Sequence, residues 1–124
     1  MLAAIMAKIV LAGKDWQTRA LLRAQLIEEG LEVEAFETLQ DALARSEEPT
    51  SRPSLLVADL YSSEDSRAEI ERLAAWAARI PIWIIASQSL LAEPQLNSRG
   101  FELILVRPID AGELVEQIKR RVKA

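Results

Sequence analysis

The side chain best placed to do chemistry is a single carboxylate, Asp59, which ends the apolar run at residues 55–58. Consecutive apolar residues without polar alternation are typical of a strand covered on both faces, as in a parallel sheet. A carboxylate without a partner is costly inside such a core, so we expect Asp59 to lie where the strand emerges. Ligands and reacting groups of open α/β sheets gather at that edge. Asp59 is therefore the first candidate for a functional residue.

The composition narrows the chemistry that this chain can perform. Its 124 residues include no cysteine and no histidine, which excludes disulfides, thiolate metal sites and the commonest general base. A reaction would have to use carboxylates, lysine, arginine or hydroxyl groups. The formal net charge of -4 argues against a general nucleic-acid surface, which would be basic. We therefore expect no nucleic-acid partner for this domain.

Apolar runs alternate with helical patterns along the whole chain. The runs with strand character lie at residues 9–12, 32–36, 55–58, 82–86 and 103–106. Strands that alternate with helices form parallel sheets, and right-handed crossovers place the helices on both faces. The pattern predicts an α/β domain with a five-stranded parallel sheet, helices on both faces and flavodoxin-like winding.

The first helix is predicted from a stripe of apolar residues at helical spacing, formed by Trp16, Ala20, Ala24 and Ile27. We expect this stripe to face the core, flanked by the leucines of the same segment. Gly30 follows the segment and is predicted to end the helix in a left-handed conformation.

Capping residues mark where other helices begin. Thr38 precedes the short second helix as a predicted N-cap. Ser66 and Glu69 have the spacing of a capping box at the start of the third helix, and Asp110 and Glu113 have it at the start of the last. These four helices are therefore predicted with defined starts or ends.

The remaining segments are predicted to be irregular or peripheral. Residues 45–53 are predicted as a polar surface loop, and a proline interrupts the helix expected at residues 90–97. Residues 1–7 are predicted as an apolar N-terminal extension of a single domain over residues 8–124, with translation starting at Met1 or Met6. No stretch is long enough to span a bilayer, so we expect a cytoplasmic protein without a membrane partner.

Several strand ends carry distinctive residues in a distinctive order. Asp59 ends the third strand, residues 81–87 form the fourth, and Gly100 precedes the fifth, which leads to Arg107. In this order and spacing the chain resembles, from Lys8 onward, the receiver domain of two-component response regulators. The resemblance implies the (βα)5 receiver architecture and a role in signal transduction.

The resemblance also implies which residues form the site. In receivers the aspartate that ends the third strand accepts a phosphoryl group, and this position is Asp59. Two acids after the first strand hold a divalent cation there, but those positions are Gly13 and Lys14. Neither side chain offers the oxygen ligands that Mg²⁺ prefers. We expect no metal, with Asp15 and Asp59 as the ligands if one binds.

Other positions of the implied site are changed as well. The hydroxyl that contacts the phosphoryl group in receivers matches Ala86, with Ser87 one residue late, and the lysine of the family matches Arg107. Arginine is a larger, planar cation and does not replace lysine as a point charge. The aromatic residue of the switch matches Ile104, whereas Pro108 is unaltered. We interpret the chain as a degenerate receiver, or pseudo-receiver.

The charges near Asp59 suggest what replaces the cation. We hypothesise a cluster in which Lys14 and Arg107 both contact Asp59 and hold one conformation. A cation about 4 Å from a carboxylate attracts it by roughly 4 kcal/mol at an effective dielectric of about 20, before desolvation is counted.

The expected function is that of a signalling module and not of an enzyme. We expect the module to act through protein–protein contact, without phosphorylation and without a cofactor. The family's contact face comprises the fourth helix, fifth strand and fifth helix, here represented by Leu90, Leu91, Ile104 and Arg120. We expect a homodimer or a partner protein there, and the resemblance adds a histidine kinase as a further partner.

Two alternatives stay open. The first is a working phosphoacceptor in a phosphorelay, in which Asp59 is phosphorylated and Asp15 helps to hold Mg²⁺. The second is a small-molecule or nucleotide-binding enzyme with the same winding. The second has less support because no glycine-rich phosphate loop follows the first strand, where Gly13 stands alone.

Overall fold

The computed structural model describes residues 7–60, 66–91 and 94–123. Most of the N-terminal extension predicted at residues 1–7, including both candidate start methionines, lies outside the described residues. The segment 61–65, which follows the candidate site residue Asp59, also lies outside them.

Five parallel strands form one sheet, as predicted. They are β1 (Lys8–Ala12), β2 (Glu32–Phe36), β3 (Leu55–Asp59), β4 (Ile82–Ala86) and β5 (Leu103–Val106), in the order β2-β1-β3-β4-β5. Three strands have the bounds expected from the sequence, and β1 and β3 are each one residue longer. The predicted fold class, an α/β domain of flavodoxin-like winding, is confirmed.

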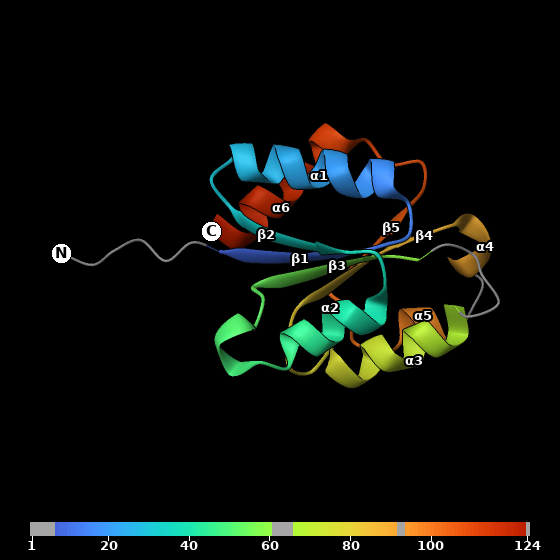
Figure 1. Ribbon diagram of the computed structural model, residues 1–124. Coiled ribbons are helices and arrows are strands. Elements are labelled where there is room, and N and C mark those ends of the chain that lie inside the picture. The colour runs from blue at the N-terminus through green and yellow to red at the C-terminus, as the bar shows by residue number, and fades with distance from the viewer. Residues whose placement is uncertain (1–6, 61–65, 92–93, 124) are drawn as a thin grey trace.

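Helices cover both faces of the sheet (Figure 1). They are α1 (Trp16–Glu28), α2 (Leu39–Ser46), the 3-10 turn η1 (Pro49–Ser51), α3 (Ser66–Trp76), α4 (Gln88–Leu91), α5 (Pro94–Asn97) and α6 (Ala111–Lys123). Figure 1 shows α1 and α6 on one face and α2, α3 and α5 on the other. Among the described helices, none is long and apolar enough to cross a membrane.

The predicted capping positions at α2 and α6 are confirmed. The Thr38 hydroxyl accepts a hydrogen bond from the Asp41 amide at 3.1 Å, and the Asp110 carboxylate accepts one from the Glu113 amide at 3.0 Å. Gly30 follows α1 with a φ of 83°, the left-handed conformation expected of it. These contacts satisfy amide groups that the first turn of a helix leaves without partners.

The polar loop predicted at residues 45–53 is wrong in part. The helix α2 continues through Arg45 to Ser46, and η1 fills the centre of the segment. The Ser46 side chain is buried, and its hydroxyl donates to the Ala42 carbonyl at 2.8 Å, so a polar residue completes the last turn without facing water.

The prediction for the inward face of α1 is wrong. Leu22 and Leu26 are buried, whereas Trp16 and Ile27 are 64% and 44% exposed, and the two alanines between them are exposed as well. Both stripes have helical spacing, so periodicity alone does not choose between them. The leucines point inward because they bury more apolar surface than alanines do.

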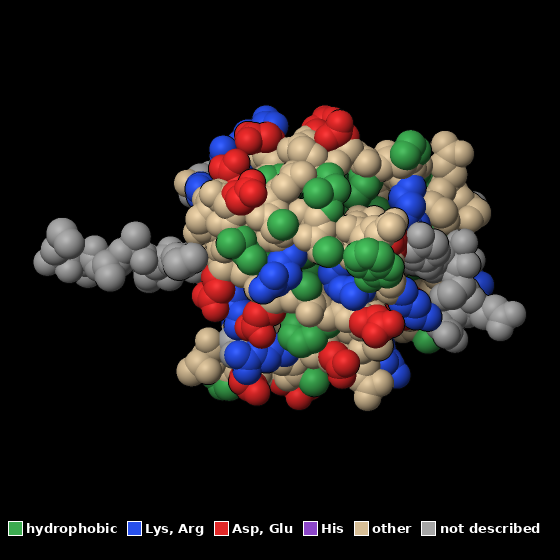
Figure 2. Space-filling model, turned by 45° about the horizontal axis from the view of Figure 1, so that its top comes forward, with side chains coloured by type: hydrophobic (Ala, Val, Ile, Leu, Met, Phe, Trp, Pro, Cys, Tyr) green, Lys and Arg blue, Asp and Glu red, His purple; other side chains and the backbone are tan. Residues whose placement is uncertain are grey.

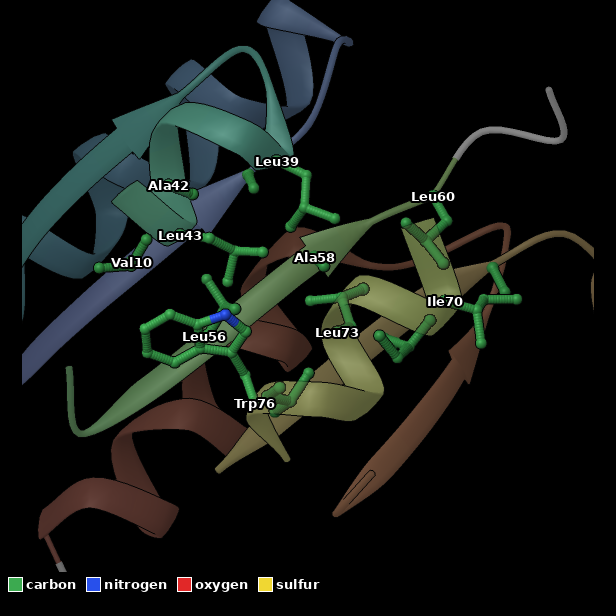
Figure 3. Packing of buried hydrophobic residues seen from close by; sticks show 14 of the residues in the cluster. Val10, Leu39, Ala42, Leu43, Leu56, Ala58, Leu60, Ile70, Leu73 and Trp76 are labelled. Carbon is green, nitrogen blue, oxygen red and sulfur yellow. The ribbon is translucent and has the colours of Figure 1, made fainter. Parts of the chain in front are cut away.

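The sheet separates two hydrophobic clusters. Figure 3 shows the cluster beneath α2 and α3, in which Leu56 of β3 lies near Leu73 and Trp76 of α3. On the other face, the buried residues of α1 and α6 pack over the sheet, with Ile118 fully buried. The two layers hold the sheet from both sides and so fix where its strand ends lie.

Candidate functional site

The carboxyl ends of β1, β3 and β5 bring three predicted site residues together. Ala12 is in register with Ala58, so Gly13 follows β1 next to Asp59 at the end of β3. Arg107 follows β5, and its amide donates to the Ala86 carbonyl of β4 at 2.9 Å. Each residue is therefore placed by the strand that precedes it.

Asp59 and Arg107 form an ion pair at this edge. The Nη2 nitrogen of Arg107 donates to an oxygen of the Asp59 carboxylate and, at 2.9 Å, to the carbonyl oxygen of Leu60. The side chain of Asp59 is 11% exposed and that of Arg107 is 25% exposed. The predicted contact between these two residues is present, and the peptide bond between Arg107 and Pro108 is cis.

The environment of Asp59 raises the pKa of its carboxyl group. Burial is the main cause, because it penalises the charged form, and the nearby Asp15 carboxylate adds to the effect. The charge of Arg107 and its hydrogen bond act in the opposite direction without outweighing burial. The carboxylate is thus partly desolvated, and Arg107 offsets only part of that cost.

Gly13 lies in close contact with Asp59. A Cβ atom built at residue 13 would be 2.9 Å from the Cβ of Asp59, closer than real Cβ atoms come to other heavy atoms. The backbone at Gly13 is held there because its amide donates to the Phe36 carbonyl at 3.0 Å. A side chain at residue 13 would therefore displace Asp59, an effect that the sequence pattern did not reveal.

Lys14 does not complete the hypothesised cluster. Its side chain is exposed, and among the described residues it forms no ion pair. With Gly13, Thr38 and Glu69 it lines a cavity of about 60 Å³ that opens beside Asp59. The cluster is therefore reduced to the pair of Asp59 and Arg107.

Asp15 is occupied as the N-cap of α1. Its carboxylate accepts from the Gln17 amide at 3.2 Å and from the Thr18 hydroxyl at 2.6 Å, one bond to each oxygen. The Thr18 hydroxyl is the main reason why the pKa of Asp15 is lowered. Capping was not anticipated for Asp15, although an aspartate directly before a helical pattern is the usual signal.

These residues do not fit a magnesium site. Mg²⁺ requires oxygen ligands in near-octahedral geometry. Arg107 engages Asp59, Asp15 caps a helix, and residues 13 and 14 are a glycine and an exposed lysine. Within the described part of the chain, no group of three acidic residues is arranged to hold a metal ion.

The hydroxyl expected near Asp59 is directed elsewhere. Ala86 is fully buried at the end of β4, and the Ser87 hydroxyl lies 3.0 Å from that of Ser89. Ile104 is half-buried and packs against the cluster beneath α2 and α3. Among the described residues, neither the Ser87 hydroxyl nor an aromatic side chain at residue 104 contacts Asp59.

The predicted contact face is smaller than expected. Leu90 is 7% exposed and belongs to the core, so it cannot contact a partner without moving. Leu91 and Ile104 are half-buried, and Arg120 is exposed on α6. Of the four residues predicted for this face, Leu91, Ile104 and Arg120 are the accessible ones.

Solved structures of known proteins share this arrangement of strands and helices. A receiver domain from Methanospirillum hungatei JF-1 has a TM-score of 0.77 at 20% identity, over 96% of this chain and 95% of its own. A response regulator from Thermotoga maritima has a TM-score of 0.74 at 15% identity, over 97% of this chain and 100% of its own. An orphan response regulator of H. pylori has a TM-score of 0.74 at 14% identity, over 94% and 96%.

This chain has the receiver fold. Comparison with protein-family models and with curated proteins finds no match to the sequence. The likeness is thus one of architecture. In this fold Asp59 ends β3 at the carboxyl edge of the sheet, with Arg107 bound to it.

Proposed function

We propose that the chain is a signalling module with a receiver fold that acts through protein–protein contact and is not phosphorylated at Asp59. The observation that carries the proposal is the bond from Arg107 Nη2 to the Asp59 carboxylate. A guanidinium bound to the acceptor oxygen replaces the metal cation and holds the strand ends in one arrangement.

The chemistry of phosphoryl transfer supports this proposal. An acceptor carboxylate must present a free oxygen in line with the leaving group, and a cation must neutralise the charge on the phosphoryl oxygens. Here one oxygen of Asp59 accepts from Arg107, and the nearby Asp15 carboxylate is engaged by the first turn of α1. Attack by the other oxygen of Asp59 would lack the metal cation, because Arg107 occupies the oxygen that a cation would bind.

The cavity that Asp59 itself lines is too small for a bound small molecule, and the neighbouring hollow of about 360 Å³, which shares Lys14 and Glu69 with it, does not include Asp59. The cavity beside Asp59, as the described residues form it, measures about 60 Å³. Pockets that bind small-molecule ligands measure roughly 300 Å³ or more. We therefore propose no enzymatic activity and no cofactor for this module.

A protein partner is proposed at the face formed by α4, β5 and α6. Leu91 of α4 and Ile104 of β5 are half-buried apolar residues, and Arg120 of α6 is an exposed cation. Such a combination of an apolar centre and a charged rim is usual in transient interfaces. In this proposal the partner recognises the constant arrangement held by Arg107 and Asp59, and not a phosphorylated state.

Phosphorylation can be tested with Mg²⁺ and acetyl phosphate, followed by intact mass measurement. We expect the wild-type chain to keep its unmodified mass. A phosphoryl adduct that is absent from the Asp59→Asn variant would overturn the proposal. Arg107→Lys is the informative companion variant, because it keeps the charge but loses the planar guanidinium; an adduct on this variant alone would show that Arg107 blocks the acceptor.

The contact face can be tested by comparing the proteins of the native host that wild type and Leu91→Glu retain. We expect one specific partner to be lost from the Leu91→Glu sample and from an Arg120→Glu sample. Arg72→Glu, an exposed substitution on α3, is the matched control and should retain the partner. Equal retention by all four proteins would place the contact elsewhere.

A further inference from the structure

The exposed side of α1 is apolar, although nothing in the described part of the chain covers it. Trp16, Leu21 and Ile27 are 64%, 49% and 44% exposed, and these are the large hydrophobic side chains that the structure leaves most open to water. Figure 2 shows hydrophobic side chains interrupting the polar surface on the face that carries α1 and α6. A helix that is apolar on both sides is typically buried on both sides.

Charged side chains border the apolar side of α1 in a particular order. Arg23 and Glu28 are both exposed, and neither forms an ion pair with another described residue. They lie on opposite borders of the stripe that runs from Gln17 through Ala20 and Ala24 to Ile27. Trp16 lies on the same border as Arg23, about two turns away, and Leu21 lies on the same border as Glu28, also about two turns away.

We propose that a second copy of this chain packs on α1, with the two helices parallel and related by a two-fold axis that runs along them. Residues 17, 20, 24 and 27 then occupy the central seam of a short parallel helix pair. In such pairs a residue on the border of Arg23 meets the residue five positions later on the opposite border of the other helix. Arg23 of one copy therefore meets Glu28 of the other, and Trp16 meets Leu21.

The complementarity is specific to the parallel orientation. Both border contacts are matched in character, one an ion pair and the other an apolar pair, and symmetry forms each of them twice. In an antiparallel pair each border meets its own counterpart. Arg23 would then lie near Trp16 of the second copy and Glu28 near Leu21, so both charges would lose their partners.

The small side chains at the centre of the seam support close packing. Ala20 and Ala24 are both exposed and allow the two helix backbones to approach. The 13 residues of α1 span about 20 Å at 1.5 Å per residue. An interface of that length is small, so we expect a reversible dimer that forms with rising concentration.

Sedimentation equilibrium over a range of protein concentrations tests the dimer. The wild-type mass should rise from monomer toward dimer, and Ala24→Glu should remain monomeric because it places a charge in the seam. Ala75→Glu, at an exposed position of α3, is the matched control and should behave as wild type. A wild-type chain that remains monomeric at every concentration would overturn the proposal.

Charge reversal tests the parallel orientation. Arg23→Glu and Glu28→Arg should each raise the dimer dissociation constant roughly tenfold, because each places like charges together twice. The double variant Arg23→Glu/Glu28→Arg should restore the wild-type constant. Failure of the double variant to restore it would exclude the pairing of Arg23 with Glu28.

Disulfide trapping tests the parallel dimer independently. The chain has no native cysteine, so an introduced cysteine can only pair with its own copy. A seam residue of a parallel two-fold pair lies opposite its own copy, so Ala24→Cys should oxidise to a covalent dimer, whereas Ala75→Cys should not. Equal crosslinking of the two variants would contradict the proposal. The dimer proposal does not depend on Asp59 or on the α4, β5 and α6 face, so it can be contradicted while the proposed function holds.

Discussion

Asp59 ends β3 and Arg107 follows β5, two strands that are not neighbours in the sheet. A single guanidinium nitrogen of Arg107 connects the two residues. Nη2 of Arg107 donates both to the Asp59 carboxylate and to the carbonyl oxygen of Leu60. Since β4 lies between β3 and β5 in the sheet, the pair spans the end of β4. The contact thus joins the edge strand to the centre of the sheet at the carboxyl edge, where ligands of open α/β sheets bind.

Removal of this guanidinium should destabilise the fold. In Arg107→Ala the Asp59 carboxylate stays buried without its partner, and the Leu60 carbonyl loses a donor. We expect the free energy of unfolding to fall by about 1–3 kcal/mol in urea titrations at pH 7. The exposed Arg120→Ala on α6 should change it by less than about 0.5 kcal/mol. Equal effects of the two substitutions would mean that the ion pair contributes no stability.

The stability of the chain should depend on pH in two opposing ways. Hydrogen bonds from Lys8 and Arg121 lower the pKa values of Glu34 and Glu102 below their ordinary 4.5. The unfolded chain then binds more protons, so the stability they contribute is present above pH 4.5 and is lost as the pH falls further. Urea titrations between pH 3 and pH 7 should show this decline on the acid side.

Asp59 should contribute with the opposite sign. Burial raises its pKa above the ordinary 3.8, so the folded chain binds more protons above that pH and loses stability as the pH rises toward the folded pKa. Asp59→Asn removes this component. We expect the stability of the variant relative to wild type to increase from acid to neutral pH. A difference that does not vary with pH would show that the carboxyl is not desolvated.

A methyl group at residue 13 should disturb the site directly. In Gly13→Ala the new Cβ would lie 2.9 Å from that of Asp59, so the side chain of Asp59 or the backbone must shift. We expect a loss of about 1–3 kcal/mol in the free energy of unfolding, since overpacking costs that much. Gly112→Ala in α6 is the matched control, because its Cβ meets no atom closer than 3.4 Å. That control should be neutral or stabilising.

The cap at Asp15 offers a test of its own. Asp15→Ala removes the acceptor for the Gln17 amide and the Thr18 hydroxyl, so stability should fall by about 1 kcal/mol. Asp15→Ser keeps an N-cap oxygen and should recover most of the loss. A thermal melt of each variant with and without Mg²⁺ separates capping from metal binding: only an Mg²⁺-dependent shift in wild type that the alanine variant lacks would indicate a ligand.

The sheet could be predicted because its strands are apolar runs bounded by polar or irregular segments. The order of those runs also predicted that Asp59 and Arg107 would meet, since the carboxyl ends of parallel strands share one edge. α6 is similarly well defined, because Leu114 and Ile118 face the core while charged residues occupy its other side. In these elements the order of apolar and charged residues allows only one orientation that buries the apolar side chains.

Other features depend on information that periodicity does not contain. The orientation of α1 was mispredicted because its alanine-containing stripe and its leucine stripe have the same spacing, and only packing against the sheet distinguishes them. Lys14 was expected at Asp59 because it follows the first strand, whose carboxyl end lies at the same edge of the sheet, but the direction of its side chain depends on the local backbone. The close approach of Gly13 to Asp59 required the register between β1 and β3.

The contact between Gly13 and Asp59 restricts how this chain could evolve. A metal site that used an acid at residue 13 would need a side chain whose Cβ lies 2.9 Å from the Cβ of Asp59, so the substitution would disturb Asp59 itself. The substituted chain would have a displaced Asp59 and would still have a lysine at residue 14. Such a substitution would be selected against unless the end of β1 moved at the same time. The present arrangement of Gly13 and Asp59 is therefore easier to conserve than to change.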